Sequence, residues 1–240
     1  MALWCLPMAK PALILFDCDG VLIDSEVISA RMLIAELRGY GVEMDMGFVS
    51  RHFLGRSYPA VLAEVRSRWG VALPDSFEAE YRARLLAAFE RELTVMPGVA
   101  QMIQDLRMPY CLATSSSPER LRHSLAVTQL APLFEGCSFT ASEVARGKPA
   151  PDLFLHAAAH MGVDPGACIV IEDSLNGVRA GLAAGMTVWR FTGGSHLTGL
   201  DLTPPDDAIP HASYADFSSL RAQNPDIFHT PLSVQNRALS

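Results

Sequence analysis

Four short, predominantly apolar segments constrain the fold of this chain of 240 residues more than any other feature. They lie at residues 12–16, 110–113, 169–171 and 187–191. Segments this short and this apolar are typical of central strands in a parallel sheet that is covered on both faces. Helical patterns lie between them, at residues 99–106, 118–126, 152–161 and 175–184. This alternation predicts an α/β fold in which right-handed crossovers connect parallel strands.

Residues 25–96 interrupt the alternation, because they contain helical patterns and no strand-like segment. The patterns lie at residues 26–38, 59–69 and 77–89. Pro59 suits the first turn of the second helix, and Gly70 suits its C-terminal cap. We therefore predict an α/β fold with a Rossmann-like parallel sheet core and a small inserted helical domain. The core comprises residues 1–24 and 97–240, and the insert comprises residues 25–96.

Composition narrows the classes of function. The formal net charge is −7, from 26 acidic and 19 basic residues, and no run of Lys or Arg is present. A nucleic-acid-binding surface is therefore not expected. No segment reaches the ~20 uninterrupted apolar residues that a membrane-spanning helix needs. We expect a monomer without nucleic-acid or membrane partners.

The two ends of the chain and its cysteines complete this picture. Pro7, Lys10 and Pro11 interrupt the apolar opening segment, which argues against a signal peptide. The segment beyond Gly193 is rich in Pro, Asp and Ser, and we interpret it as edge structure and surface loops. The cysteines lie far apart, which favours free buried thiols in a reducing, cytoplasmic compartment. They are Cys5, Cys18, Cys111, Cys137 and Cys168.

Polar side chains follow three of the four predicted strands, where open α/β sheets collect their reactive groups. They are Asp17 and Asp19 after the first strand, Thr114 to Ser117 after the second, and Glu172 and Asp173 after the third. Lys148 lies in a Pro-rich loop before the next helical pattern. Each of these groups alone is commonly a turn, a helix cap or a solvated charge. Their equivalent positions in one sheet favour a shared site.

The residue types indicate what such a site would bind. Four converging carboxylates would raise one another's pKa values unless a cation lay among them. Oxygen ligands in that number suit Mg²⁺. Hydroxyl groups, helix N-terminal amides and one lysine suit a phosphoryl group. The sequence therefore predicts a magnesium-assisted reaction on a small phosphate ester.

Four segments of the sequence resemble, in order, the motifs of the haloacid dehalogenase-like superfamily. They are F-D-C-D-G-V-L-I-D-S-E, L-A-T-S-S, G-K-P-A-P-D and V-I-E-D-S-L-N-G-V-R-A-G-L-A-A-G-M. More narrowly, the chain resembles the beta-phosphoglucomutase-like phosphatases. The resemblance covers residues 13–191 and includes the helical insert, which is similar to the family's cap domain. In the family, this cap chooses the substrate.

The resemblance implies a role for each acidic residue. Asp17 would attack phosphorus and become an aspartyl-phosphate. Asp19 would protonate the leaving oxygen and then deprotonate the hydrolytic water. Mg²⁺ would be held by Asp17, by the backbone carbonyl of Asp19 and by Asp173, with Glu172 binding it directly or through water.

The resemblance also implies roles for the other polar groups. Thr114 and the amide of Ser115 would hold the phosphoryl oxygens, and Lys148 would neutralise the charge that develops on them. Ser174 and Asn176 would support the acidic loop.

The predicted cap carries two candidates for substrate contact, Arg56 and Tyr58, in a loop that leads into a helix. A guanidinium at Arg56 would suit an anionic or hydroxyl-rich substrate. The alternative is that Arg56 is solvated or pairs with a cap carboxylate such as Glu64. Family mutases carry a histidine where this chain has Ser29 and a phosphate-binding arginine where it has Tyr58. These two departures favour hydrolysis of a sugar, polyol or sugar-acid phosphate, with a phosphosugar mutase as the alternative.

Other reactions of the family fit less well. Dehalogenases of this fold lack the aspartate at the Asp19 position, and phosphonate cleavage needs a cap lysine, which residues 26–95 do not contain. A protein that only binds its ligand would be expected to have lost Asp17 or Lys148.

Overall fold

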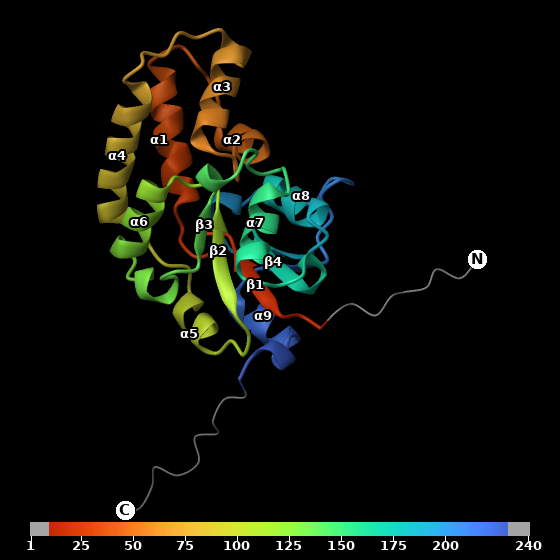
Figure 1. Ribbon diagram of the computed structural model, residues 1–240. Helices are drawn as coiled ribbons and strands as arrows, with labels where there is room; N and C mark the ends of the chain where they lie inside the picture. Colours follow the sequence, from red (N-terminus) through yellow and green to blue (C-terminus); the bar gives the residue numbers. More distant parts are fainter. Residues whose placement is uncertain (1–9, 230–240) are drawn as a thin grey trace, which may run out of the picture.

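The computed structural model of the protein describes residues 10–229, so Cys5 and the rest of residues 1–9 lie outside the described part. Its centre is a six-stranded sheet in the order β3-β2-β1-β4-β5-β6, and every neighbouring pair is parallel (Figure 1). The strands are β1 Leu13–Phe16, β2 Tyr110–Thr114, β3 Ser138–Thr140, β4 Cys168–Glu172, β5 Thr187–Phe191 and β6 Ala212–Tyr214. The predicted α/β fold and its four strands are confirmed. The edge strands β3 and β6 were not predicted, because three residues are too few to show an apolar segment.

Successive side chains of the central strands point to opposite faces of the sheet, and helices cover both faces. Ile14 and Phe16 pack in one hydrophobic cluster with α5, α6 and α9, whereas Leu13 and Leu15 pack in another with α7 and α8. These helices are α5 Val99–Gln104, α6 Pro118–Val127, α7 Asp152–His160, α8 Leu175–Ala183 and α9 Phe217–Gln223. Two-sided coverage explains why the central strands are apolar throughout.

The register of the sheet places the predicted reactive residues at one edge. Phe16 lies beside Leu112 of β2 and beside Ile171 of β4. Asp17 therefore leaves β1 at the same level as Glu172 at the end of β4. The chain adds β2 and β3 on one side of β1 and later adds β4 to β6 on the other side. The loops that follow β1 and β4 therefore run in opposite directions at the carboxyl ends of these strands. Ligand sites of open α/β sheets form at such a switch point.

Four helices form a separate layer above this edge (Figure 1). They are α1 Glu26–Arg38, α2 Met46–His52, α3 Tyr58–Trp69 and α4 Phe77–Glu92. They enclose a hydrophobic cluster of their own, which includes the fully buried Leu37, Val65 and Phe89. Gly70 ends α3 in the left-handed conformation at φ +63°, as predicted. The short helix α2 was not predicted, and its start is capped by Asp45, which accepts a hydrogen bond from the N–H of Phe48 at 2.7 Å.

The two chain segments that join this helical layer to the sheet run side by side. The N–H of Asp24 donates to the carbonyl of Thr94 at 2.9 Å, and the N–H of Met96 donates to the carbonyl of Leu22 at 2.9 Å. Ile23 and Val95 form an antiparallel bridge between them. The helical layer is therefore attached through one short two-stranded ribbon.

Two further expectations concern the described residues. No helix within residues 10–229 has both the length and the apolar character needed to cross a membrane. Cys18, Cys111 and Cys168 are buried free thiols, but Cys137 is only partly buried, because it precedes the edge strand β3.

The contact between α8 and the sheet gives a test of this packing. A Cβ at Gly181 would lie 2.6 Å from Val188 Cγ2, so Gly181→Val should overpack the interface and destabilise the fold by about 1–3 kcal/mol. Ala183→Val, on the exposed side of the same helix, should cost at most ~0.7 kcal/mol from helix propensity. Urea unfolding of both variants measures the difference, and equal effects would show that α8 does not approach the sheet this closely.

Candidate active site

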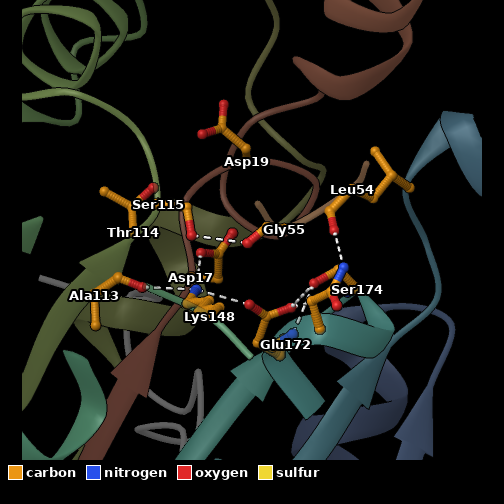
Figure 2. A network of polar contacts seen from close by, with 12 residues as sticks. Asp17, Asp19, Leu54, Gly55, Ala113, Thr114, Ser115, Lys148, Glu172 and Ser174 are labelled. Atoms are coloured by element: carbon orange, nitrogen blue, oxygen red, sulfur yellow. Dashed lines mark hydrogen bonds and ion pairs between the residues drawn. The ribbon is translucent and has the colours of Figure 1, made fainter. Parts of the chain in front are cut away.

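Lys148 is the centre of a polar network at the carboxyl ends of β1, β2 and β4 (Figure 2). Its ammonium donates to Asp17 Oδ1 at 2.5 Å, to Glu172 Oε1 at 2.7 Å and to the carbonyl of Ala113 at 3.0 Å. The side chain has no exposed surface. Burial lowers the pKa of Lys148, but the two carboxylates outweigh burial and raise the pKa above its ordinary value. Lys148 is therefore a fixed positive charge beside Asp17.

The start of α8 holds the other oxygen of Glu172. Glu172 Oε2 accepts from the backbone N–H of Ser174 at 2.8 Å and from its hydroxyl at 3.0 Å. The same hydroxyl accepts from the N–H of Gly177 at 3.0 Å and caps the helix. A Cβ at Gly177 would lie 1.8 Å from the Glu172 carboxyl carbon, so glycine is required here. Ser174 thus lies against the acidic loop, where the resemblance places it.

Asp17, Glu172 and Asp173 bring one carboxylate oxygen each to within 4.8 Å of one another. Burial raises the pKa of Asp17 and of Asp173 well above ordinary values; Glu172 adds to this effect and Lys148 opposes it. Asp173 Oδ2 is buried and has no hydrogen-bond partner among the described residues. Three buried carboxylates beside one ammonium leave an excess of negative charge. This donor set fits a hard divalent cation such as Mg²⁺, which the cluster could hold.

The fourth predicted carboxylate, that of Asp19, does not join this cluster. It points away from Asp17 (Figure 2), because the chain turns after β1 and the alternation of an extended strand stops there. Asp19 pairs with Arg120 Nη2 at 2.7 Å and accepts from the hydroxyl of Ser116 at 2.6 Å and from that of Ser25. Burial raises the pKa of Asp19, but Arg120 and these hydrogen bonds outweigh it and lower the pKa below its ordinary value. The expectation of four converging carboxylates is wrong for this side chain.

The hydroxyl groups that follow β2 lie beside the network and bond to the surrounding chain. Thr114 Oγ1 accepts from the N–H of Ser116 at 3.1 Å. Ser115 Oγ donates to the carbonyl of Gly55, in the helical layer, at 2.8 Å. Ser117 Oγ caps α6 by accepting from the N–H of Arg120 at 3.3 Å. The start of α6 is thereby fixed next to Asp17, with Thr114 almost completely buried.

A cavity of about 290 Å³ lies between this edge of the sheet and the helical layer. Asp17, Asp19 and the hydroxyl groups line it from the sheet side. Side chains of α1, α3 and α4 line it from the other side, including the apolar Leu33, Val61 and Leu85. A partly open cavity with a few convergent polar groups suits a small molecule.

Arg56 and Tyr58 both line the cavity, but they are engaged differently. Arg56 pairs with Glu64, and it also donates to the carbonyl of His52 at 3.4 Å. The structure thus shows the alternative in which Arg56 pairs with a cap carboxylate. The Tyr58 ring stacks on Tyr81 with centroids 4.9 Å apart, and its buried hydroxyl has no hydrogen-bond partner in the described chain. Tyr58 therefore has an open donor at the cavity wall.

Asn176 binds the helical layer rather than the acidic loop that it was expected to support. Its Nδ2 donates to the carbonyl of Leu54 at 2.8 Å. The next residue, Gly55, has φ +73°, and a Cβ there would lie 2.0 Å from Ser174 Oγ. Together with the bond from Ser115, this contact draws residues 54–55 directly over the start of α8.

Two buried residues near the site were not predicted. Arg120, which pairs with Asp19, lies in the first turn of α6 directly after the hydroxyl cluster, and this position was the available signal. His196 lies in the 3-10 helix η4 Ser195–Leu197, and its Nε2 is 2.8 Å from Asp173 Oδ2 without hydrogen-bond geometry. Burial lowers the pKa of His196. No pattern in the sequence indicates His196, because the segment beyond Gly193 has the composition of surface loops.

Comparisons with known proteins agree with this geometry. Residues 11–185 match the haloacid dehalogenase-like hydrolase family. A 6-phosphogluconate phosphatase of Escherichia coli K12 is 31% identical over 191 residues, covering 79% of this chain and 86% of its own length. Hexitol phosphatase A of the same organism is 33% identical over 191 residues, covering 72% and 80%. A haloacid dehalogenase-like protein of unknown function from Agrobacterium tumefaciens, known from its crystal structure, is 33% identical with a TM-score of 0.74, covering 90% of this chain and 99% of its own.

The match to this hydrolase family and the relatives named as phosphatases identify a hydrolase of phosphoric monoesters. The chain belongs to the haloacid dehalogenase-like hydrolase family, as the resemblance of its four motifs implied.

The raised pKa values of Asp17 and Asp173 predict a metal-dependent stability. A carboxyl whose pKa is raised by folding destabilises the fold as the pH rises from about 3.9, its unfolded value, through the folded value. Asp173→Asn should therefore raise the melting temperature in EDTA at neutral pH. A gain of about 1 kcal/mol in the free energy of unfolding would correspond to roughly 2–4 °C. The gain should be smaller at lower pH. Magnesium should raise the melting temperature of the wild type and not that of this variant.

The control is Asp216→Asn, the same change at the cap of α9, where asparagine caps equally well. It should respond to magnesium as the wild type does. A magnesium-dependent shift that survives in Asp173→Asn would remove Asp173 from the metal site.

Proposed function

We propose that this protein is a magnesium-dependent phosphatase that hydrolyses a small phosphorylated metabolite through an aspartyl-phosphate on Asp17. The observation that carries the proposal is the position of Asp17. It belongs to the acidic cluster, lines the cavity and is held in place by Lys148. The relatives named as phosphatases of 6-phosphogluconate and of hexitol phosphates support a sugar, polyol or sugar-acid phosphate as substrate.

In this proposal Asp17 Oδ attacks phosphorus, and the leaving oxygen departs from the opposite side. Lys148 opposes the rise in the pKa of Asp17 that burial causes, which favours the ionised nucleophile, and it would offset charge on the phosphoryl oxygens. Asp17, the carbonyl of Asp19 and Asp173 would hold Mg²⁺, with Glu172 binding it directly or through water. The bound ion would supply positive charge that lets a phosphate approach these carboxylates. Thr114 and the amide of Ser115 would hold the phosphoryl oxygens.

Asp19 would act as the general acid and then as the base that activates water. Its carboxylate now faces Arg120, so it must rotate toward Asp17 before it can transfer a proton. Its lowered pKa means that it begins in the ionised form at neutral pH. Asp19 must therefore leave Arg120 and take up a proton from water before it can protonate the leaving oxygen.

We further propose that residues 25–96 act as a cap that excludes bulk water while the ester is bound. The bonds from Ser115 and Asn176 to residues 54–55 support a closed position of this cap. Tyr58 is the stronger candidate for contact with the substrate, because Arg56 is paired with Glu64. The free thiols of the described cysteines support a reducing compartment such as the cytoplasm.

A phosphosugar mutase is the alternative function. Ser29 lies where the mutases carry a histidine, and its hydroxyl donates to the carbonyl of Ser25 at 2.9 Å and accepts from Arg120 at 3.2 Å. A serine held in this way offers no proton relay of the histidine type, which favours hydrolysis. Free phosphate measured against isomerised sugar phosphate, with and without a bisphosphate activator, distinguishes the two functions.

Asp17→Asn should abolish turnover, because an amide is both a poor nucleophile and a poor metal ligand. The loss should exceed the ~10²–10⁴-fold expected from losing acid–base catalysis alone. Steady-state hydrolysis of p-nitrophenyl phosphate measures it, and intact-mass analysis of rapidly quenched wild type should reveal one phosphoryl group on the protein. Asp216→Asn, the control, should be as active as the wild type. Residual activity above about 1% would contradict Asp17 as the nucleophile.

Activity should require Mg²⁺ and be suppressed by Ca²⁺. Calcium takes 6–8 oxygen ligands at longer distances, so it should draw both oxygens of Asp17 into its own coordination and misalign the attack. Titration of calcium into the magnesium-loaded enzyme should inhibit competitively with respect to magnesium. Full activity in EDTA would instead remove the metal from the mechanism.

A further inference from the structure

Arg120 is a largely buried residue at the wall of the cavity. Its Nη2 pairs with Asp19 at 2.7 Å and donates to the hydroxyl of Ser29 at 3.2 Å. Its guanidinium carbon lies 5.2 Å from the centre of the Phe89 ring, in α4. Only 19% of the side chain is exposed. Its Nε is buried and has no hydrogen-bond partner in the described part of the chain.

The pair with Asp19 creates an electrostatic problem for the proposed reaction. Asp19 must leave Arg120 before it can reach the leaving oxygen. A largely buried guanidinium that loses the carboxylate paired with it is strongly destabilised unless another acceptor takes that place. Some other acceptor must therefore take the place of Asp19 at Arg120 during the reaction.

The cavity is the open side from which a replacement can come. Arg120 lines it together with Asp17, so a molecule whose phosphate lies at Asp17 can extend toward Arg120. A hydroxyl group would accept a hydrogen bond but leave the charge uncompensated. A carboxylate would replace the Asp19 carboxylate in kind and could engage both Nη2 and the unpartnered Nε, a bidentate arrangement that guanidinium favours.

We propose that Arg120 is a specificity-determining residue that binds a carboxylate of the substrate, and that this exchange of partners releases Asp19. The inference rests on the proposed function and narrows its substrate to a phosphorylated hydroxy acid. The exchange couples recognition to chemistry, because an ester without the carboxylate leaves Asp19 held at Arg120. When such an ester binds, the carboxylate of Asp19 would lie too far from the leaving oxygen to protonate it.

Glu26 is the internal rival for this role. It lines the cavity in the first turn of α1, and it interacts electrostatically with Arg120. Burial raises the pKa of Glu26 to about 7, so a substantial fraction of it is protonated at neutral pH. If Glu26 replaced Asp19 at Arg120, substrates with and without a carboxylate would be hydrolysed equally well.

The test uses pairs of esters that differ only at the end remote from phosphate. 6-Phosphogluconate is compared with glucitol 6-phosphate, and 3-phosphoglycerate with glycerol 3-phosphate. One of the two pairs should have the length that lets the carboxylate reach Arg120 while the phosphate lies at Asp17. In that pair, kcat/KM of the wild type should be roughly 10–100-fold higher for the acid than for the polyol, as expected for a hydrogen bond to a charged group. The difference should lie in kcat as well as in KM, because the carboxylate also releases Asp19.

Arg120→Met keeps the length of the side chain and removes its charge, so it should bring the acid-to-polyol ratio close to one. Arg120→Lys should restore part of the ratio and provides a second variant if the first is poorly folded. Arg82→Met is the matched control. Arg82 also lines the cavity, but it is bound to Ser117 at 2.6 Å and to Glu78 at 2.8 Å, so its loss should leave the ratio unchanged.

Three outcomes would overturn the inference: no acid preference in either pair, an equal fall for acid and polyol in both Arg120 variants, or an equal loss of the ratio in Arg82→Met. Hydrolysis of p-nitrophenyl phosphate by the wild type separates this failure from failure of the proposed function. That ester has a good leaving group and no carboxylate. Its magnesium-dependent hydrolysis without an acid preference contradicts the role of Arg120 alone, whereas its complete stability contradicts the phosphatase itself.

Discussion

The buried ion pairs of Lys148 are the interaction on which the rest of this structure depends. One ammonium with no exposed surface joins the ends of β1, β2 and β4, through Asp17, the carbonyl of Ala113 and Glu172. Without it, the carboxylates at this edge would repel one another in a medium that screens charge poorly. Because the lysine serves three strands at once, the sheet and the reactive centre cannot be altered independently.

The two aspartates that follow β1 have pKa values shifted in opposite directions. Asp17 lies in the excess of negative charge, and burial raises its pKa, whereas Asp19 lies against Arg120, and its pKa is lowered. Two residues of the same type, separated by one residue, thereby lie in opposite electrostatic environments. The division depends on the turn after β1, which points the two carboxylates in different directions (Figure 2).

The sequence was sufficient for the elements with a strong periodic pattern and insufficient for contacts made by tertiary structure. The four central strands and three of the four insert helices follow from apolar spacing. Asp17 and Glu172 follow from their positions at strand ends, and Lys148 from its place in a Pro-rich loop before α7. The short β3, β6 and α2 carry too few residues for a pattern. The direction of the Asp19 side chain depends on its pairing with Arg120, about 100 residues further along the chain. The approach of His196 to Asp173 joins segments about 20 residues apart. Local sequence patterns do not encode contacts of either kind.

The ribbon that joins the helical layer to the sheet has an evolutionary consequence. Its two strands leave and rejoin the core at Leu22 and Met96, which are hydrogen-bonded neighbours. An insertion whose ends already touch adds little loop-closure entropy to the folding of its host, whatever its length. Insertions and deletions within the helical layer therefore need not disturb the sheet or the position of its lysine, so this part of the chain is free to vary in length.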